Sequence, residues 1–319
     1  MRRREFVTLL GGAAAWPLAA PVLKPGEAAA EGRRGAFDPR ITPARGDLAA
    51  QHLAGTVEAR RFVPGKPYEI GAAQAPLCEA PAYDAALLTE ALKGEGVMIY
   101  DVSPDGWAWG QLAADGYVGY VPARTLCAPG PQPTHRVSAL RTFVFPGPSA
   151  KLRPVETLSF GCRLAIVRLD EAFAVTSSGG HVPLLHLAPV GEKESDFVAV
   201  AERFLGTPYL WGGKTSLGTD CSGLVQIALT ACGASCPRDT DMQEQALGEA
   251  LARPHGSGEL RRGDLLFWKG HVGIVRNEAT LVHASAHYMA VVFEPIAPAI
   301  ERIRAEAGEI TSVRRLPPS

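Results

Sequence analysis

A glycine-rich loop that leads into a helix constrains the fold of this chain more than any other stretch. Residues 209–224 read Tyr-Leu-Trp-Gly-Gly-Lys-Thr-Ser-Leu-Gly-Thr-Asp-Cys-Ser-Gly-Leu. The glycines interrupt regular structure before Asp220, and from Leu224 onward the apolar residues recur at helical spacing. Gly233 then stands where a glycine commonly ends a helix. The pattern predicts a helix with Asp220 as its N-cap and Cys221 in its first turn.

Cys221 occupies the position in this predicted helix where a thiol is most readily activated. Unpaired backbone N–H groups and the positive end of the helix dipole favour the thiolate, which is the nucleophilic form of cysteine. A free cysteine is more often only a small core residue, so position alone does not identify a nucleophile. The interpretation therefore depends on finding a base and a group that orients the base.

Two histidines farther along the chain supply those groups. Residues 263–275 have a strand pattern that carries His271, and residues 280–284 form a second short apolar strand that carries His283. In a hairpin centred on Asn277 the two histidines face each other, with Cβ atoms about 4.5–5.5 Å apart. A cysteine at a helix start, a histidine that takes its proton and a third polar group form an activated-nucleophile arrangement.

Five short motifs between residues 197 and 293 follow one another in an order that identifies a family. They are Tyr-Leu-Trp-Gly-Gly, Asp-Cys-Ser-Gly-Leu, Pro-Arg-Asp, Gly-Asp-Leu-Leu-Phe and His-Val-Gly-Ile. Together they resemble the NlpC/p60 family of papain-like cysteine peptidases, which cut bacterial cell-wall peptides. The resemblance implies an α+β papain-like catalytic domain at residues 191–319. Its first element is predicted to be a helix at residues 195–205, capped by Ser195.

The same resemblance implies the catalytic roles. Cys221 is expected to be the nucleophile, His271 the base and His283 the residue that orients the base.

The resemblance also implies which residues contact the substrate. Trp211 walls the groove in the family, although the sequence alone also allows a core position, and Tyr209 lies near the reaction centre. Asp220 and Ser222 grip the substrate, and the second carboxylate oxygen of Asp220 is expected to receive a substrate ammonium. Thr240 stands where relatives often have serine and keeps the hydroxyl group.

The region before the catalytic domain has the pattern of short strands and turns of two small all-β units. Gly119-Tyr-Val-Pro and Gly180-His-Val-Pro recur about sixty residues apart, which suggests a duplicated unit. Each resembles the last strand and terminal turn of a bacterial SH3 domain. We therefore expect an SH3-like barrel at residues 58–130 and a divergent second one at residues 131–190.

The first of these units carries one aromatic residue that is placed to reach outside its barrel. Tyr117 follows a glycine in the turn before the last strand. In relatives with an N-terminal bacterial SH3 domain, the matching tyrosine lines one end of the catalytic groove. Trp107 and Trp109 are instead expected in the barrel core.

This arrangement resembles the γ-D-glutamyl-L-diamino acid endopeptidases of the family. Such enzymes cut the bond between γ-D-glutamate and a diamino acid, either diaminopimelate or lysine, in wall peptides with a free N-terminal L-alanine. The resemblance therefore implies a role in cell-wall turnover or recycling. Three alternatives remain: an endopeptidase on intact peptidoglycan, an amidase or acyltransferase on the same scaffold, and a catalytically inactive wall-binding protein.

Composition narrows the possible partners. The formal net charge of −1 argues against nucleic acid, and the six cysteines lack metal-ligand spacing. We expect peptidoglycan peptide fragments as the partner, no metal or other cofactor, and a monomer.

The N-terminal sequence has the organisation of an export signal. Three arginines precede an uncharged run from Phe6 to Leu23, and a stretch of small residues follows at Ala28. This resembles a twin-arginine signal, predicted at residues 1–30, with a linker or arm at residues 31–57. It predicts a periplasmic or exported protein with no membrane span after signal cleavage. An uncleaved anchor, or a cytoplasmic protein with a mis-assigned start, remains the alternative.

Overall fold

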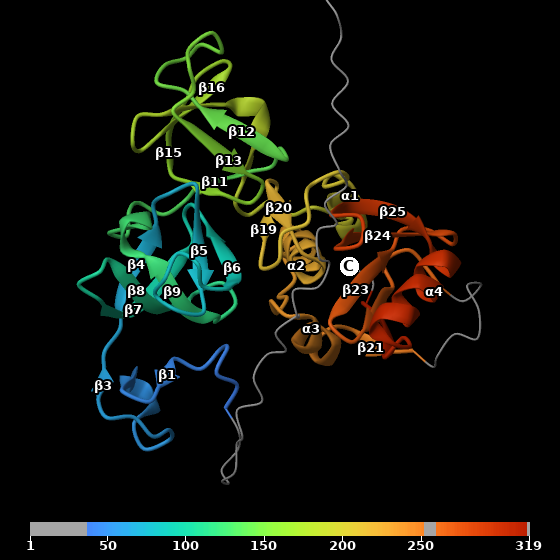
Figure 1. Cartoon of the computed structure of the whole chain (residues 1–319). Helices are drawn as coiled ribbons and strands as arrows, with labels where there is room; N and C mark the ends of the chain where they lie inside the picture. The colour runs from blue at the N-terminus through green and yellow to red at the C-terminus, as the bar shows by residue number, and fades with distance from the viewer. Residues whose placement is uncertain (1–36, 252–259, 318–319) are drawn as a thin grey trace, which may run out of the picture. The chain divides into compact units, whose positions relative to one another are not determined.

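The structure is a computed structural model that describes residues 37–251 and 260–317 (Figure 1). The predicted signal at residues 1–30 lies outside the described residues, as does the first part of the predicted linker. No helix within the described ranges is long and apolar enough to cross a bilayer.

Residues 38–57 belong to the segment that is predicted to be a linker or arm. They form an arm that packs on the first β unit. The arm contributes two strands of a small sheet, in the order β1 (Ala44–Arg45), β2 (Leu48–Ala50) and β3 (Phe62–Val63). Leu48 is fully buried against Trp109 and Val118 of the following unit. Removing this apolar side chain from water stabilises the packed arm.

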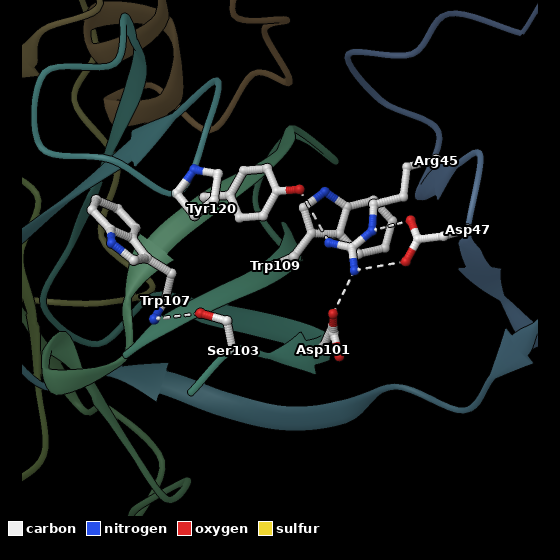
Figure 2. A pocket seen from close by; sticks show the side chains of 8 residues that line it. Arg45, Asp47, Asp101, Ser103, Trp107, Trp109 and Tyr120 are labelled. Carbon is white, nitrogen blue, oxygen red and sulfur yellow. Dashed lines mark hydrogen bonds and ion pairs between the residues drawn. The ribbon is translucent and has the colours of Figure 1, made fainter. Parts of the chain in front are cut away.

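A pocket of about 310 Å³ lies where the arm meets this unit (Figure 2). Figure 2 shows the Arg45 guanidinium over the Trp109 ring, 4.8 Å from the ring centroid. The Arg45 donors are taken by Asp47, Asp101 and the Tyr120 hydroxyl. Arg45 is therefore already paired with both carboxylates that line this pocket.

The first β unit is a seven-stranded sheet. Its order is β10 (Leu126–Cys127), β4 (Lys66–Ile70), β7 (Gly96–Val102), β8 (Trp107–Leu112), β9 (Val118–Pro122), β5 (Gln74–Cys78) and β6 (Leu87–Leu92). Trp107 and Trp109 are each 4% exposed, which confirms that they are buried. The edge strand β6 contacts β19 (Lys214–Thr215) of the predicted catalytic domain.

The second β unit divides into three smaller sheets. These are β14 (Arg163–Leu164), β11 (His135–Val137) and β18 (Leu187–Pro189); β12 (Arg141–Val144) and β13 (Glu156–Ser159); and β15 (Ile166–Leu169), β16 (Phe173–Thr176) and β17 (His181–Pro183). Both units end in a strand, one 3-10 turn and a short strand, as the repeated Gly-x-Val-Pro motif indicates. That the second unit is a complete SH3 barrel stays a prediction.

The predicted catalytic domain, called the catalytic domain below, is built on a six-stranded antiparallel sheet. Its order is β21 (Glu249–Ala250), β26 (Ser312–Arg315), β22 (Leu265–Trp268), β23 (His271–Val275), β24 (Thr280–Ser285) and β25 (Ala290–Pro295). A small hairpin, β19 (Lys214–Thr215) and β20 (Gly218–Thr219), lies in the loop before the nucleophile. The helices are α1 (Phe197–Glu202), α2 (Cys221–Ala231), α3 (Thr240–Ala246) and α4 (Ile296–Ala307).

Strand alternation gives the two faces of this sheet different partners. Val272 and Val282 belong to the core that contains α2, whereas Val275 and Leu281 belong to the core that contains α4. Figure 1 accordingly shows α2 and α4 on opposite sides of β23 and β24. His271 and His283 share the odd-numbered face with the α4 contacts.

Helix α1 begins later than predicted. Asp196, not Ser195, is its N-cap, because the Asp196 carboxylate accepts the N–H groups of Val198 and Ala199 at 2.9 and 3.2 Å. A carboxylate at this position is favoured by both hydrogen bonding and the helix dipole.

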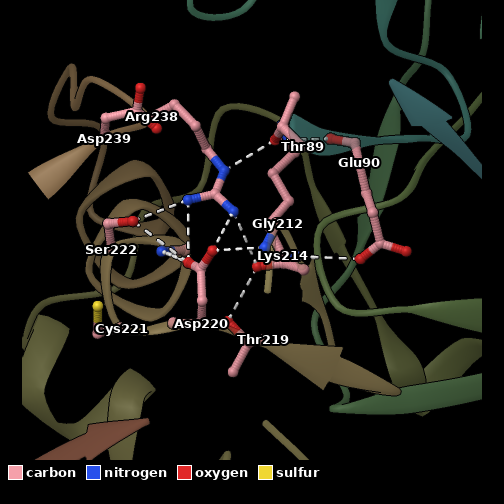
Figure 3. Close-up of polar contacts among 12 residues, drawn as sticks. Thr89, Glu90, Gly212, Lys214, Thr219, Asp220, Cys221, Ser222, Arg238 and Asp239 are labelled. Carbon is pink, nitrogen blue, oxygen red and sulfur yellow. Dashed lines mark hydrogen bonds and ion pairs between the residues drawn. The ribbon is translucent and has the colours of Figure 1, made fainter. Parts of the chain in front are cut away.

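Buried polar contacts join β6 to the catalytic domain (Figure 3). The Thr89 hydroxyl accepts from Nε of Arg238 at 2.8 Å, and the Glu90 carboxylate accepts from the Lys214 backbone N–H at 3.0 Å. All four residues are buried. The first β unit therefore holds an arginine that belongs to the catalytic domain.

We expect Thr89→Val to lower the free energy of unfolding by about 1–3 kcal/mol, because it leaves a buried guanidinium N–H without its acceptor. Urea unfolding of the full chain measures this change. Thr157→Val is the matched control on an exposed position, where the expected change is within about 0.5 kcal/mol. Equal unfolding midpoints for the two variants would show that the Thr89 contact contributes nothing to stability.

Candidate active site

The predicted start and end of the nucleophile helix are confirmed. Asp220 caps α2 by accepting the Gly223 N–H at 2.7 Å, and Cys221 is the first helical residue. Gly233 follows the C-cap with φ of 81°, a conformation that glycine adopts without strain. Gly223 also lets the loop approach the helix, since an added Cβ would lie 2.3 Å from the Gly213 carbonyl oxygen.

The Cys221 thiol lies among polar groups from three elements. Its Sγ is 3.9 Å from the Thr240 hydroxyl on α3 and 4.0 Å from the Gly270 carbonyl oxygen before β23. The backbone N–H of Val272 also faces it. The thiol is thus held against the backbone on both sides of His271.

Burial, rather than the helix start, dominates the ionisation of this thiol. Burial and the Asp220 charge raise the pKa of Cys221 to about 11, against the lowering effects of Val272 N–H, Thr240 and Ser222 N–H. The effects that favour the thiolate at a helix start are therefore outweighed by burial at Cys221.

The two histidines make the predicted contact through a different register. His271 Nε2 and His283 Nδ1 are 2.9 Å apart. The ladder pairs Ile274 with Val282 and Val275 with Leu281. Extending this register places Gly273 opposite His283 and His271 at the diagonal position, and a Cβ built on Gly273 would lie 3.7 Å from His283 Cβ. Direct pairing about Asn277 is therefore wrong, because the turn is centred one residue later. The contact survives since aromatic side chains can reach diagonal neighbours.

A carboxylate that the sequence reasoning missed extends this pair. Glu294 Oε2 is 3.0 Å from His283 Nε2, and the Glu294 side chain is only 5% exposed. In the β24–β25 ladder His283 is opposite Val292, so Glu294 is again at a diagonal position. In the sequence, the signal that could have indicated this role for Glu294 is a single acidic residue in the apolar run Val-Val-Phe-Glu.

Arg302 of α4 balances the charge of this carboxylate. Its Nε and Nη2 donate to Glu294 at 3.0 and 2.7 Å, and the Tyr288 hydroxyl donates at 3.2 Å. Burial alone raises the pKa of Glu294, but hydrogen bonds from His283 and Arg302 outweigh it and lower the pKa to about 2. Glu294 is therefore an ionised acceptor at neutral pH.

The hydrogen-bond network then assigns the tautomer of each histidine. Because the Glu294 carboxylate only accepts, a neutral His283 donates from Nε2 and accepts at Nδ1. His271 must donate from Nε2, so its Nδ1 is left as the proton acceptor. Burial, His283 and Arg302 lower the pKa of His271 to about 3. The resting pair is therefore a neutral thiol and a neutral imidazole.

Asp220 and Ser222 both accept hydrogen bonds from a buried arginine, Arg238. The two carboxylate oxygens of Asp220 accept from Arg238 Nη1 and Nη2 at 2.9 and 2.7 Å, and Ser222 Oγ accepts from Nη1 at 2.8 Å. The second oxygen of Asp220 also accepts the Gly212 N–H at 2.8 Å (Figure 3). This oxygen thus already accepts two hydrogen bonds, and an ammonium contact at Asp220 stays a prediction.

Tyr117 reaches outside its β unit, as predicted. Its hydroxyl donates to Asp239 Oδ2 at 2.8 Å, and burial and the Asp239 charge raise the pKa of Tyr117, which keeps the donor proton in place. Arg40 of the arm donates to the same oxygen at 2.8 Å. Asp239 immediately precedes Thr240, so arm and first β unit meet the catalytic domain one residue from a group that contacts the nucleophile.

The other two aromatic residues differ in exposure. Tyr209 is half-buried against the catalytic core, and burial and the charges of Cys221 and Asp220 raise its pKa, which places it near the nucleophile. Trp211 is 69% exposed, so the core interpretation is wrong. Substrate contact by Tyr209, Trp211, Ser222 and Thr240 stays a prediction.

No group of three or more His, Cys, Asp or Glu side chains within residues 37–251 and 260–317 is arranged to hold a metal ion. The site offers nucleophilic and acid–base chemistry from side chains.

Comparison with known proteins supports the resemblance to the NlpC/p60 family. Residues 206–302 match the NlpC/P60 family, and residues 77–126 match the bacterial dipeptidyl-peptidase SH3 domain. The solved structure of an NlpC/P60 family protein from Bacillus cereus aligns with a TM-score of 0.66 at 20% identity, covering 79% of this chain and all of that one. That likeness shows the fold.

Three relatives carry functional names. The chain is 26% identical over 243 residues to a gamma-D-glutamyl-L-lysine dipeptidyl-peptidase of Bacillus cereus, covering 66% of this chain and 71% of that protein. It is 38% identical over 88 residues to dipeptidyl-peptidase 6 of Lysinibacillus sphaericus, covering 28% of this chain and 31% of the relative. It is 33% identical over 105 residues to a probable endopeptidase of Corynebacterium glutamicum, covering 32% and 48%. The chain thus spans about a third to a half of the length of the last two.

We expect alkylation of Cys221 by iodoacetamide to accelerate with pH toward about pH 11, because burial raises the pKa of this thiol. Peptide mass spectrometry at each pH follows the modification of Cys221 itself, and Cys221→Ala serves as the blank. A rate that is already maximal below pH 7 would contradict the neutral pair and indicate a preformed thiolate–imidazolium pair.

Proposed function

From its NlpC/P60 domain (residues 206–302) and its bacterial dipeptidyl-peptidase SH3 domain (residues 77–126), we infer that this chain is a cysteine peptidase acting on peptidoglycan-derived peptides. We propose that it cuts the bond between γ-D-glutamate and a diamino acid in peptides with a free N-terminal L-alanine. The names of two relatives support this specificity. The observation that carries it is the Tyr117–Asp239 contact beside the nucleophile.

The proposed reaction uses the histidine tautomers that the hydrogen-bond network assigns. His271 Nδ1 takes the Cys221 proton as the thiolate attacks the amide carbonyl carbon. Backbone N–H groups at the start of α2, including that of Cys221, stabilise the oxyanion. The protonated His271 then gives its proton to the leaving amine, and water releases the acyl group from Cys221.

Asp239, rather than Asp220, is the group we propose for the substrate ammonium. Three carboxylates, those of Asp38, Asp239 and Asp241, share the single guanidinium of Arg40. This cluster has an excess of negative charge, and the Asp239 side chain is 25% exposed. Its charge attracts an ammonium, which loses less on desolvation where a carboxylate pairs with it.

Tyr117 and the arm then limit the length of the substrate. We propose that they close the groove beyond the first residue of the peptide, so that longer peptide or glycan is excluded. Export through the twin-arginine-like sequence would bring such an enzyme to released wall peptides outside the cytoplasm.

A lytic endopeptidase on intact peptidoglycan is the second candidate, because a relative from Corynebacterium glutamicum is named a probable endopeptidase. It differs from the first proposal in one structural requirement, an open groove at the amine end. The two functions therefore predict different substrates.

We expect wild-type kcat/KM to be about 10- to 100-fold higher for L-Ala-γ-D-Glu-diaminopimelate than for its N-acetylated form, because acetylation removes a charge-assisted contact. Asp239→Asn should reduce this preference to a few-fold, since Asn keeps an acceptor for Tyr117 but loses the charge. Mass spectrometry of the released dipeptide measures both rates.

Asp241→Asn is the matched control, because Asp241 pairs with Arg40 but is 57% exposed. It should keep most of the preference. Equal rates on the two substrates in the wild type would contradict the closed groove and favour the endopeptidase.

A further inference from the structure

A chain of two hydrogen bonds, one part-buried and one buried, crosses three adjacent strands of the sheet. It runs from His271 on β23 to His283 on β24 at 2.9 Å, and from His283 to Glu294 on β25 at 3.0 Å. Each step joins diagonal positions on the same face of the sheet. His283 and Glu294 are almost completely buried, so neither exchanges these partners readily for water.

We propose that Glu294 is a positioning residue of the reaction and that Arg302 sets the strength of its effect. Glu294 fixes the tautomer of His283, and through His283 that of His271. Its negative charge also stabilises the imidazolium that His271 becomes when it takes the Cys221 proton. The proposal needs only the cysteine-peptidase chemistry of the proposed function, not the proposed peptide.

Proton positions during the step follow from the partners. The S–H bond of Cys221 breaks and a new N–H bond forms at His271 Nδ1, which gives a thiolate and an imidazolium. His271 keeps its Nε2 proton in the bond to His283 Nδ1. His283 keeps its Nε2 proton in the bond to Glu294, because the pKa of Glu294 is lowered far below that of an imidazolium by its hydrogen bonds. The proton thus travels no farther than His271.

Arg302 opposes Glu294 electrostatically. Its guanidinium makes two hydrogen bonds to Glu294, and its charge disfavours protonation of His271, whereas the charge of Glu294 favours it. The charged or titratable groups around His283 are His271 from β23, Glu294 from β25 and Arg302 from α4. Tyr288 also contacts Glu294, and Glu306 of α4 contacts Arg302 at 3.6 Å.

These opposite effects give the proposal a distinctive test. Glu294→Gln keeps an acceptor for His283 but removes the charge, so we expect kcat to fall about 10- to 100-fold with KM changed less than about twofold. The acid limb of the kcat/KM profile should move to lower pH. Arg302→Met should move that limb to higher pH, because it removes the charge that opposes protonation of His271.

Glu306→Gln is the matched control. It makes the same change of charge on α4, one contact away from Glu294, and should leave both kcat and the acid limb at their wild-type values. Thermal unfolding of each variant shows whether it remains folded at the assay temperature. A merely structural role for Glu294 would reduce stability without moving the two acid limbs in opposite directions.

Nitrogen-15 NMR of the histidine rings supplies a readout that needs no substrate. Wild type should show both His271 and His283 protonated at Nε2, and Glu294→Ala should release His283 into a mixture of tautomers. If the tautomers do not change in Glu294→Ala, or if folded Glu294→Gln has wild-type kcat and pH profile, the proposal is overturned. A failure of the proposed substrate would instead leave the NMR result intact.

Discussion

The buried ion pair between Arg238 and Asp220 is the interaction on which the site depends. Arg238 is 1% exposed and donates to both Asp220 oxygens, to Ser222 Oγ, to the Gly213 carbonyl and to Thr89 of the first β unit. It thereby joins the loop before the nucleophile, the start of α2 and a neighbouring unit. Removing one partner of such a pair leaves an uncompensated buried charge, which typically costs about 3–5 kcal/mol. The position of Cys221 at the start of α2 therefore depends on this network of hydrogen bonds.

The same burial that makes the network rigid also decides the chemistry of the thiol. The Asp220 charge and the loss of water both act against a thiolate at Cys221. A resting thiolate is thus unfavourable, which fits the proposed transfer of the Cys221 proton to His271 during the reaction. The proton then has to be taken by His271, the proposed base. Burial favours the neutral form of His271 as well. Nucleophile and base each lie near a carboxylate that is balanced by an arginine, Arg238 for Asp220 and Arg302 for Glu294.

What the sequence predicted correctly is what short-range chemistry determines. The cap at Asp220, the helix start at Cys221 and the glycine after its end all follow from neighbours within a few residues. The histidine contact was predicted from an approximate hairpin, and it was robust to the wrong register because both side chains stayed on the same face of the sheet.

What the sequence did not predict depends on residues far apart in the chain. Glu294 is an acidic residue in an apolar strand, and only the pairing of β24 with β25 brings it to His283. The saturation of Asp220 likewise depends on Arg238, which is 18 residues away, and the packing of the arm depends on Trp109. Periodicity and capping rules carry no information about such contacts.

These long-range contacts also bring together groups proposed for the reaction and groups proposed for substrate choice from different parts of the chain. The proposed reacting groups Cys221, His271 and His283 all lie within the 97 residues from 206 to 302, which match one family model. The groups around Asp239 come from elsewhere: Arg40 from the arm and Tyr117 from the first β unit. If the amine end of the groove is built there, as we propose, part of the substrate choice resides outside the sequence that carries the chemistry. Changes in the arm or in the turn at Tyr117 can then alter which peptides are cut while the thiol, its base and Glu294 remain as they are.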